Sequence, residues 1–337
     1  MATSGTVTYR ANALVIVNAA LRLCGAYDSE GGSSSTQQKN DALEALNMLV
    51  KAWEANGLQL WERRWAVIFP QKNQGVYVLG SPGPAGDHAT LTTPLNGGFV
   101  QTTLSSAAAD AATSIVVTSA TGQLSTVGNT AVSITAGYYI GIQVDDGSTH
   151  WTTVSSVSGT TIGLTDALDD SAESGNYVYC YQTKLIRPLR ILDGFVRQAQ
   201  QGNDSPMKPL SREEYNRFGL KSSAGSPVQY YYDQQANTGN LYVYPVPSLA
   251  TQLIFLEIQR PIDDFSSTSD DFDLPQEWAD ALKYNLARRI APEYEVSQYK
   301  YNQIKDLADE TFALLNSWDQ ESASLLLQPS WYDYHSS

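Results

Sequence analysis

The sequence predicts an α+β protein with a four-helix layer from two terminal helical hairpins, a small antiparallel sheet and an inserted all-β module. Three observations predict this fold. Near both termini, apolar residues recur at intervals of three and four, the period of an amphipathic helix. In the middle, short apolar runs alternate with turn residues, as in antiparallel strands. The composition also changes between residues 94 and 183, which indicates a separate module.

The first hairpin is expected within the first 57 residues. One helix should span residues 8–25 and end at Gly25, because glycine commonly terminates helices. The second should begin after Ser35, which has the spacing of a capping box with Gln38, and should end at Gly57. The apolar face of this second helix is expected to consist of Leu43, Leu46, Leu49, Val50 and Trp53.

Short strands are expected on both sides of the module. They are predicted at residues 65–70, 75–79, 228–233, 241–244 and 253–260. Pro245 and Pro247 follow the fourth of these strands and predict that it lies at a sheet edge, because proline cannot donate a ladder hydrogen bond. Residues 238–240 should form the preceding turn, and residues 211–217 one or two turns of helix.

Residues 94–183 are expected to form the inserted module within a host domain made of residues 1–93 and 184–337. The segment is rich in Thr, Ser, Ala, Gly and Val and poor in Lys and Arg. Asp145-Asp146-Gly147 and Ser158-Gly159 are predicted hairpin turns. Five strands at this spacing favour a small antiparallel barrel or a sandwich; they are expected at residues 114–118, 138–144, 150–157, 160–164 and 176–182.

The second hairpin is predicted at the other end of the chain. A helix within residues 273–292 has Asp273 as a potential cap, Pro275 in its first turn and Pro292 as its stop, and a last helix follows at residues 296–321. The two hairpins should pack together, because each has one apolar face and no other helix to cover it. Their core is expected to contain Leu43, Leu46, Val50, Trp53, Trp278, Leu282, Leu286, Ile290, Leu315 and Trp318.

The residues after the last helix, 322–337, form a potential binding arm. Its apolar residues are Leu325, Leu326, Leu327, Trp331, Tyr332 and Tyr334. Exposed to water, these side chains would make the segment adhesive. The arm is therefore expected either to fold onto the protein's own core or to insert into a partner's groove, where Trp and Tyr serve as anchors.

Charge and composition restrict the possible functions. The chain has 21 Lys and Arg against 35 Asp and Glu, a net charge of −14, which argues against a protein that grips nucleic acid but is compatible with DNA passing by. Its 20 Tyr residues favour half-exposed sheets and interfaces. Cys24 and Cys180 are expected to be buried thiols in a protein folded in a reducing cytoplasm. Neither a signal peptide nor a membrane span is expected.

No motif in the sequence points to catalysis. The three histidines have no ligand at metal-binding spacing, and nucleophile, phosphate-loop and dinucleotide motifs are not found, so neither metal nor cofactor is expected. The acidic residues 263–273 are interpreted as a solvated loop rather than a cation site. Paired carboxylates for glycan hydrolysis are available in principle among Glu62, Glu213, Glu214 and Glu277, but no pair is singled out.

Several motifs resemble those of phage head-to-tail adaptor proteins. They are Asp273-Leu274-Pro275-Gln276-Glu277-Trp278, the stretches 281–287 and 291–294, and upstream the stretches 225–233, 241–247 and 260–265. The sequence is similar in particular to the tail accessory, or packaged-DNA stabilisation, family of short-tailed phages. The resemblance covers roughly residues 8–80 and 184–320; the 94–183 module departs from the short forms of the family and is expected to be a peripheral decoration.

The resemblance implies a structural role at the head-tail junction of the virion, with assembly in the host cytoplasm. Such adaptors form a twelve-membered ring beneath the portal protein, extend the channel for double-stranded DNA, help retain the packaged genome and carry tail nozzle, tube or fibre proteins. In this family the C-terminal arm engages the portal. Two alternatives stay open: a cell-wall glycan hydrolase that acts during entry, and a carbohydrate- or fibre-binding role of the inserted module.

Overall fold

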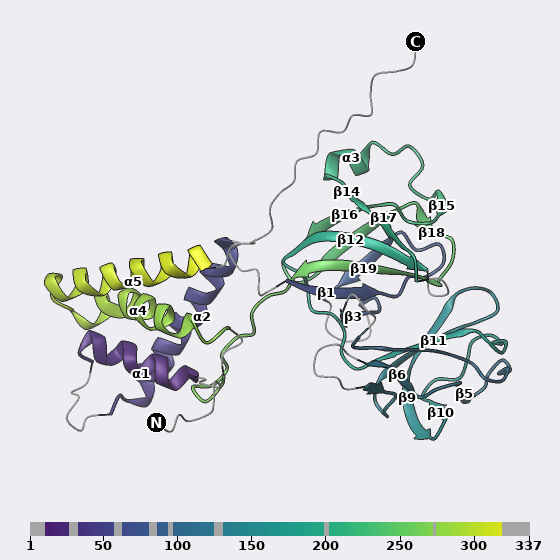
Figure 1. The fold of residues 1–337 in the computed structure, drawn as a ribbon, viewed down its shortest axis with the longest axis horizontal. Coiled ribbons are helices and arrows are strands. Elements are labelled where there is room, and N and C mark those ends of the chain that lie inside the picture. Colours follow the sequence, from purple (N-terminus) through teal and green to yellow (C-terminus); the bar gives the residue numbers. More distant parts are fainter. Residues whose placement is uncertain are drawn as a thin grey trace, which may run out of the picture. The chain divides into compact units, whose positions relative to one another are not determined.

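The computed structural model describes residues 11–26, 33–56, 63–80, 86–93, 97–124, 131–198, 202–271 and 274–318 (Figure 1). The fold is mixed α+β, which confirms the predicted class. The chain divides into two compact units. The helical unit contains residues 1–61 and 262–337, and the β unit contains residues 62–261.

The first helix of the helical unit begins later than the sequence pattern suggests. Helix α1 spans Ala13–Cys24, because the Asn12 side chain caps it by accepting a hydrogen bond from the Val15 amide at 3.0 Å. Gly25 ends it in the left-handed conformation, as expected. Helix α2 spans Thr36–Asn56.

The predicted capping box of α2 is confirmed. The Ser35 amide donates to Oε1 of Gln38 at 2.8 Å, and the Gln38 amide donates to Oγ of Ser35 at 3.2 Å. The box satisfies amides at the start of the helix that would otherwise lack a partner.

Helix α4 spans Trp278–Ile290, so its start differs from the predicted cap at Asp273, which lies outside the described residues. The chain enters the helix through a tight turn, in which the Trp278 amide donates to the Pro275 carbonyl at 3.0 Å. Pro292 stops the α-helix as expected, and residues Ala291–Tyr294 continue as the 3₁₀ helix η2. Helix α5 then spans Gln298–Trp318.

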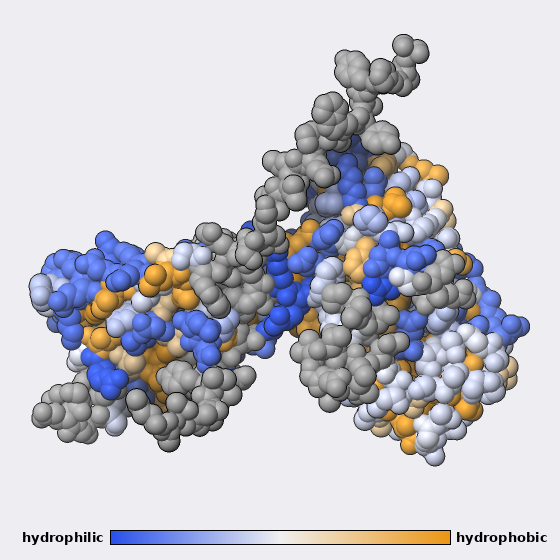
Figure 2. Space-filling model, viewed as in Figure 1, coloured by the Kyte–Doolittle hydropathy of each residue, from blue (hydrophilic) through white to orange (hydrophobic). Residues whose placement is uncertain are grey.

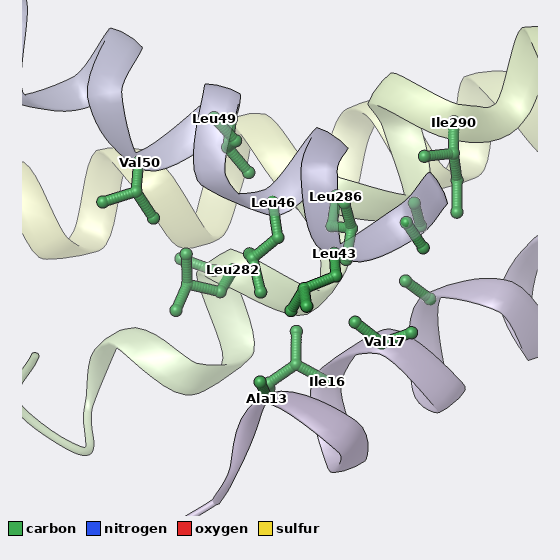
Figure 3. Packing of buried hydrophobic residues seen from close by; sticks show 14 of the residues in the cluster. Ala13, Ile16, Val17, Leu43, Leu46, Leu49, Val50, Leu282, Leu286 and Ile290 are labelled. Atoms are coloured by element: carbon green, nitrogen blue, oxygen red, sulfur yellow. The ribbon is translucent and has the colours of Figure 1, made fainter. Parts of the chain in front are cut away.

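Helices α1, α2, α4 and α5 contribute to one hydrophobic core. In Figure 3, side chains of α4 point towards those of α2 and α1. The Trp53 ring lies 5.6 Å from Trp278 and 5.1 Å from Phe312 of α5. Of the residues expected in this core, the cluster contains Leu43, Leu46, Val50, Trp53, Trp278, Leu282, Leu286, Ile290 and Leu315; the Trp318 side chain lies outside the described part.

The β unit contains two sheets built from the host segments. The five-stranded sheet has the order β13 (Asp204–Pro206), β12 (Arg190–Gln198), β19 (Gln252–Gln259), β1 (Arg63–Ile68) and β3 (Ala89–Thr92). The four-stranded sheet has the order β14 (Lys208–Pro209), β16 (Gln229–Gln234), β17 (Gly239–Tyr244) and β2 (Val76–Leu79). Alternate residues of the two sheets enter a shared core, as the period of two requires.

Three smaller elements also belong to the β unit. Strands β15 (Ala224–Gly225) and β18 (Val246–Pro247) form one pair, and β6 (Thr121–Leu124) and β7 (Ala131–Ser133) form another. The predicted short helix is α3, Arg212–Asn216, with a capping box between Ser211 and Glu214.

Strand β17 corrects two predictions. It lies between β16 and β2 and not at an edge, because Pro245 and Pro247 come after its last residue and remove no ladder hydrogen bond. The turn before it lies at residues 235–238, where the Gln235 amide donates to the Thr238 carbonyl, and Gly239 and Asn240 already belong to the strand.

A six-stranded antiparallel sheet lies wholly within residues 100–181. Its order is β4 (Val100–Thr103), β11 (Tyr177–Tyr181), β8 (Tyr139–Gln143), β9 (Thr149–Ser158), β10 (Thr161–Leu164) and β5 (Ser114–Val116). Its edge strands meet beyond their ends: the Ser105 amide donates to the Val116 carbonyl, and the Thr118 amide to the Thr103 carbonyl. The sheet therefore forms a partly closed barrel around its own hydrophobic core.

Candidate interaction surfaces

The acidic loop before α4 is held by its own contacts. Three donors, the Ser266 amide, the Ser266 hydroxyl and the Ser267 amide, bind one carboxylate oxygen of Asp270 at 2.8–2.9 Å and lower the pKa of Asp270. Asp264 pairs with Lys51 at 2.9 Å. Among the described residues, no three His, Cys, Asp or Glu side chains gather as metal ligands. These contacts support a structural role for the loop.

Of the carboxylates considered for glycan hydrolysis, two serve local structure, one belongs to the other unit and one lies outside the described residues. Glu213 pairs with Arg217 at 2.6 Å, and Glu214 accepts the Ser211 amide at 2.7 Å in the capping box of α3. Glu277 belongs to the other unit, where it precedes α4, and Glu62 lies outside the described residues. The geometry therefore favours no pair of these residues.

His88 is a packed core histidine. Its ring stacks on Trp151 with centroids 3.8 Å apart, and its Nδ1 lies 2.8 Å from the Tyr181 hydroxyl. Burial, followed by the positive charge of Lys184, lowers the pKa of His88 to about 3, so the ring is neutral at pH 7.

His150 has a carboxylate neighbour that sequence spacing did not indicate. Its Nδ1 lies 3.0 Å from Oδ1 of Asp169, which comes from the loop after β10. The contact depends on how the barrel strands pair, so the separation of the two residues along the sequence does not predict it.

A shallow cavity in the β unit is the natural place to look for a carbohydrate. It measures about 180 Å³ and is lined by His88, Tyr139, Trp151, Thr152, Thr153, Asp166 and Lys184. Its rings are already stacked against one another: His88 covers Trp151, and Tyr139 stacks on Tyr181 with Lys184 above the Tyr139 ring. The site therefore lacks the open aromatic platform that stacking of a sugar would use.

An aromatic layer joins the barrel to the five-stranded sheet. Phe69, next to β1, stacks on Tyr181 and meets the edge of Phe99, each at 5.4 Å. The Gln71 side chain supplements this packing, because it donates to the Thr149 carbonyl at 2.8 Å and accepts the Thr149 amide at 3.0 Å. Barrel and host strands therefore share a core, which is a tighter attachment than a peripheral decoration needs.

The expected tyrosine-rich surface lies on the outer face of β16 and β17. Tyr231 and Tyr242 are cross-strand neighbours with ring centroids 5.5 Å apart, and Tyr215 of α3 packs against both. Phe218 stacks on Tyr244 at 4.1 Å. The adjoining Val228 and Leu220 are exposed, so this face combines aromatic rings with accessible apolar surface, a composition typical of interfaces.

A second exposed apolar stripe runs along α5. Tyr299, Leu307 and Leu314 are 75%, 40% and 62% exposed. Figure 2 shows apolar residues among hydrophilic ones on the visible face of the helical unit. Apolar periodicity did not reveal this stripe, because residues spaced along a helix have the same pattern whether they face a core or solvent.

The predicted arm cannot be compared with these surfaces. Its apolar residues lie outside the described part of the chain; they are Leu325, Leu326, Leu327, Trp331, Tyr332 and Tyr334.

None of the described helices is both long and apolar enough to cross a bilayer.

The net charge differs strongly between the two units. The helical unit has nine Lys and Arg against 20 Asp and Glu, a net charge of −11. The β unit has 12 against 15, a net charge of −3. The acidity of the protein therefore belongs mainly to the helical unit.

Comparison with known proteins identifies the kind of molecule to which these surfaces belong. No match was found among curated proteins. The family model described as SU10 adaptor protein matches residues 11–325, which include the described parts of both units. The chain therefore belongs to the SU10 adaptor protein family, and it is a structural adaptor of the phage virion.

Proposed function

We propose that the protein forms a ring at the head-tail junction, docks beneath the portal protein and extends the channel through which DNA leaves the head. The family match over residues 11–325 carries this proposal. The twelve-membered ring, the retention of packaged DNA and the assignment to the tail accessory family of short-tailed phages are parts of the same proposal.

The helical unit is the proposed ring-forming part, with its two hairpins as a four-helix layer. Two features support this assignment. Its helices share a single core that contains two tryptophans, and exposed apolar side chains on α5 offer contact area for a neighbour. Its net charge of −11 would let double-stranded DNA pass without sticking, because like charges repel.

The remaining partners follow from the same proposal. The arm at residues 322–337 inserts into the portal, and the β unit carries the tail nozzle, tube or fibre proteins. The tyrosine-rich face of β16 and β17 supports the second assignment, because half-exposed tyrosines provide contact area at low entropic cost.

Purified protein, alone and mixed with portal protein, provides the test. We expect a ring in electron micrographs and a mass near twelve copies, with the ring seated on the portal in the mixture. Protein that stays monomeric with portal protein present would contradict the proposal. Release of soluble fragments from peptidoglycan would instead favour the hydrolase alternative.

A further inference from the structure

The shallow cavity of the β unit lies where the barrel meets the host segments. Thr153 comes from β9 and Asp166 from the loop after β10, both within the barrel. His88 precedes β3, and Lys184 follows β11 where the chain returns to the host segments. The cavity therefore needs both parts of the β unit, and neither forms it alone.

The stacked rings of the cavity leave polar edges without partners. His88 and Trp151 cover one another with centroids 3.8 Å apart. The indole N–H of Trp151 is buried and has no hydrogen-bond partner among the described residues. Nδ1 of His88 lies 2.8 Å from the Tyr181 hydroxyl, whereas no described residue bonds to Nε2 of the same ring. Because this ring is neutral at pH 7, its Nε2 donates or accepts according to the tautomer, and a ligand hydroxyl suits either case.

The cavity also carries one charge of each sign. Lys184 donates to the Gly86 carbonyl at 2.6 Å, and its ammonium lies 5.2 Å from the centre of the Tyr139 ring. Burial lowers the pKa of Lys184, so its charge is partly removed from water and favours an anionic ligand group. Asp166 is exposed; one of its carboxylate oxygens accepts the Thr152 hydroxyl at 3.0 Å, and the other has no partner among the described residues.

These groups select a small ligand that combines a carboxylate with hydroxyls. The cavity measures about 180 Å³, below the roughly 300–1,000 Å³ of sites for drug-sized ligands, so its ligand is no larger than a single sugar. A carboxylate suits the Lys184 ammonium, and neighbouring hydroxyls can donate to Asp166 and bond to Nε2 of His88. A phosphate dianion is disfavoured, because Asp166 would repel its second charge.

We propose that this cavity binds a hexuronic acid, a sugar unit that carries a carboxylate, through charge and ring edges rather than through stacking. The site gives the inserted module a role in the recognition of acidic glycans. The inference goes beyond the proposed ring and does not depend on it, because every residue that lines the cavity belongs to the β unit.

Saturation-transfer difference NMR of the full chain with sodium glucuronate provides the test. We expect a signal from glucuronate that saturates on titration. Glucose lacks the carboxylate and should bind about tenfold more weakly or less, because one charge-assisted hydrogen bond is lost. Acetate has the carboxylate but no hydroxyls, and it should also bind more weakly than glucuronate.

Two substitutions in the cavity locate the binding. Lys184→Met removes the ammonium but keeps an unbranched side chain, so it should abolish the preference for glucuronate over glucose. Asp166→Asn should weaken binding of both sugars several-fold, because hydrogen bonds to a charged acceptor are stronger than those to a neutral one. Lys208→Met and Asp110→Asn are the matched controls: they change exposed residues outside the cavity and should bind as the wild-type protein does. Circular dichroism would establish that each variant is folded.

Each outcome supports or overturns the proposed site. Weaker binding in the two cavity variants, with both controls unchanged, supports it. Glucuronate that gives no transfer signal from the wild-type protein overturns it. Equal affinity for glucuronate and acetate would overturn it in favour of a simple anion site, and wild-type binding by both cavity variants would place the sugar elsewhere. A failure of the protein to form rings would contradict the proposed function and leave this site intact.

Discussion

The helical unit and the β unit place their charge and their aromatic rings differently. The helical unit has a largely aliphatic core with the Trp53–Trp278 contact at its centre, and it carries most of the net charge. The β unit is nearly neutral and holds its barrel to a host sheet through a layer of aromatic rings. The helical unit therefore carries most of the charge, whereas the β unit has an aromatic-rich cluster in addition to two largely aliphatic ones.

Both units nevertheless complete interrupted backbone hydrogen bonding in the same way. In the helical unit, the Asn47 amide group bonds to both the N–H and the C=O of Phe265, each at 2.9 Å. In the β unit, Gln71 does the same for Thr149. A primary amide can donate and accept at once, so it makes the two hydrogen bonds that the backbone of a neighbouring strand residue would make. It thereby satisfies backbone groups that burial would otherwise leave unpaired. The comparison shows that the units differ in composition rather than in how they satisfy their backbones.

The largest expected effect breaks the core of the helical unit alone. Trp278 is 1% exposed, so Trp278→Ala should lower the free energy of unfolding of this unit by about 3–5 kcal/mol. Chemical unfolding followed by circular dichroism at 222 nm would report the helices, and amide hydrogen exchange of the strand segments, read by mass spectrometry, would report the β unit. We expect the helical transition to shift and the β transition to stay; a joint shift would mean that the two units unfold as one.

A smaller effect is expected in the aromatic interior of the β unit. Gly141 lies opposite Trp151 in the barrel, and a Cβ atom at this position would lie 2.7 Å from carbons of the Trp151 ring. Gly141→Ala should therefore destabilise the β unit by about 1–3 kcal/mol through overpacking. Gly137→Ala provides the control for steric contact, because Cβ would meet nothing within 4 Å there, although its positive φ adds its own strain. Equal losses in the two variants would argue against a rigid ring at Trp151.

Lowering the pH should destabilise the β unit through His88. The pKa of His88 is lowered to about 3 in the folded state, against about 6.5 in the unfolded chain. Below pH 6.5 the unfolded chain binds a proton that the folded state does not. The contribution of the neutral His88 to the free energy of unfolding is therefore complete only above pH 6.5. It then falls by up to about 1.4 kcal/mol per pH unit as the pH drops towards 3.

Unfolding of the β unit at several pH values would measure this slope, with His88→Phe as the comparison. The variant keeps a ring on Trp151 but has no group to protonate, so its stability should vary less between pH 6.5 and 4. An unchanged pH dependence in the variant would show that other groups cause the loss.

The sequence predicted the features of the fold that depend on local chemistry. The capping box at Ser35, the stop at Gly25 and the hairpin at Asp145-Asp146-Gly147 follow from a few adjacent residues, and the structure confirms each. The start of α4 was predicted too early, because a proline compatible with the first turn of a helix is equally compatible with the tight turn that precedes it.

Features that depend on strand pairing could not be predicted. Strand β4 was missed because its sequence, Val-Gln-Thr-Thr, has one strongly apolar residue, and its pairing partner β11 lies more than 70 residues away. Arg63 and Arg190 lie on either side of Gln259 only because β19 pairs with both β1 and β12 in this register. Sequence spacing gives no information about such contacts.

The smallest effect on stability is expected from removing residues 322–337. The described core of the helical unit ends at Leu315, so the shortened chain should keep both unfolding transitions of the wild-type protein. Under the proposed function, the same truncation removes the arm and should weaken attachment to the portal, which co-sedimentation with portal protein would measure. Loss of the helical transition on truncation would instead place the arm in the protein's own core, and portal binding would then require another surface, of which the exposed stripe on α5 is the first to test.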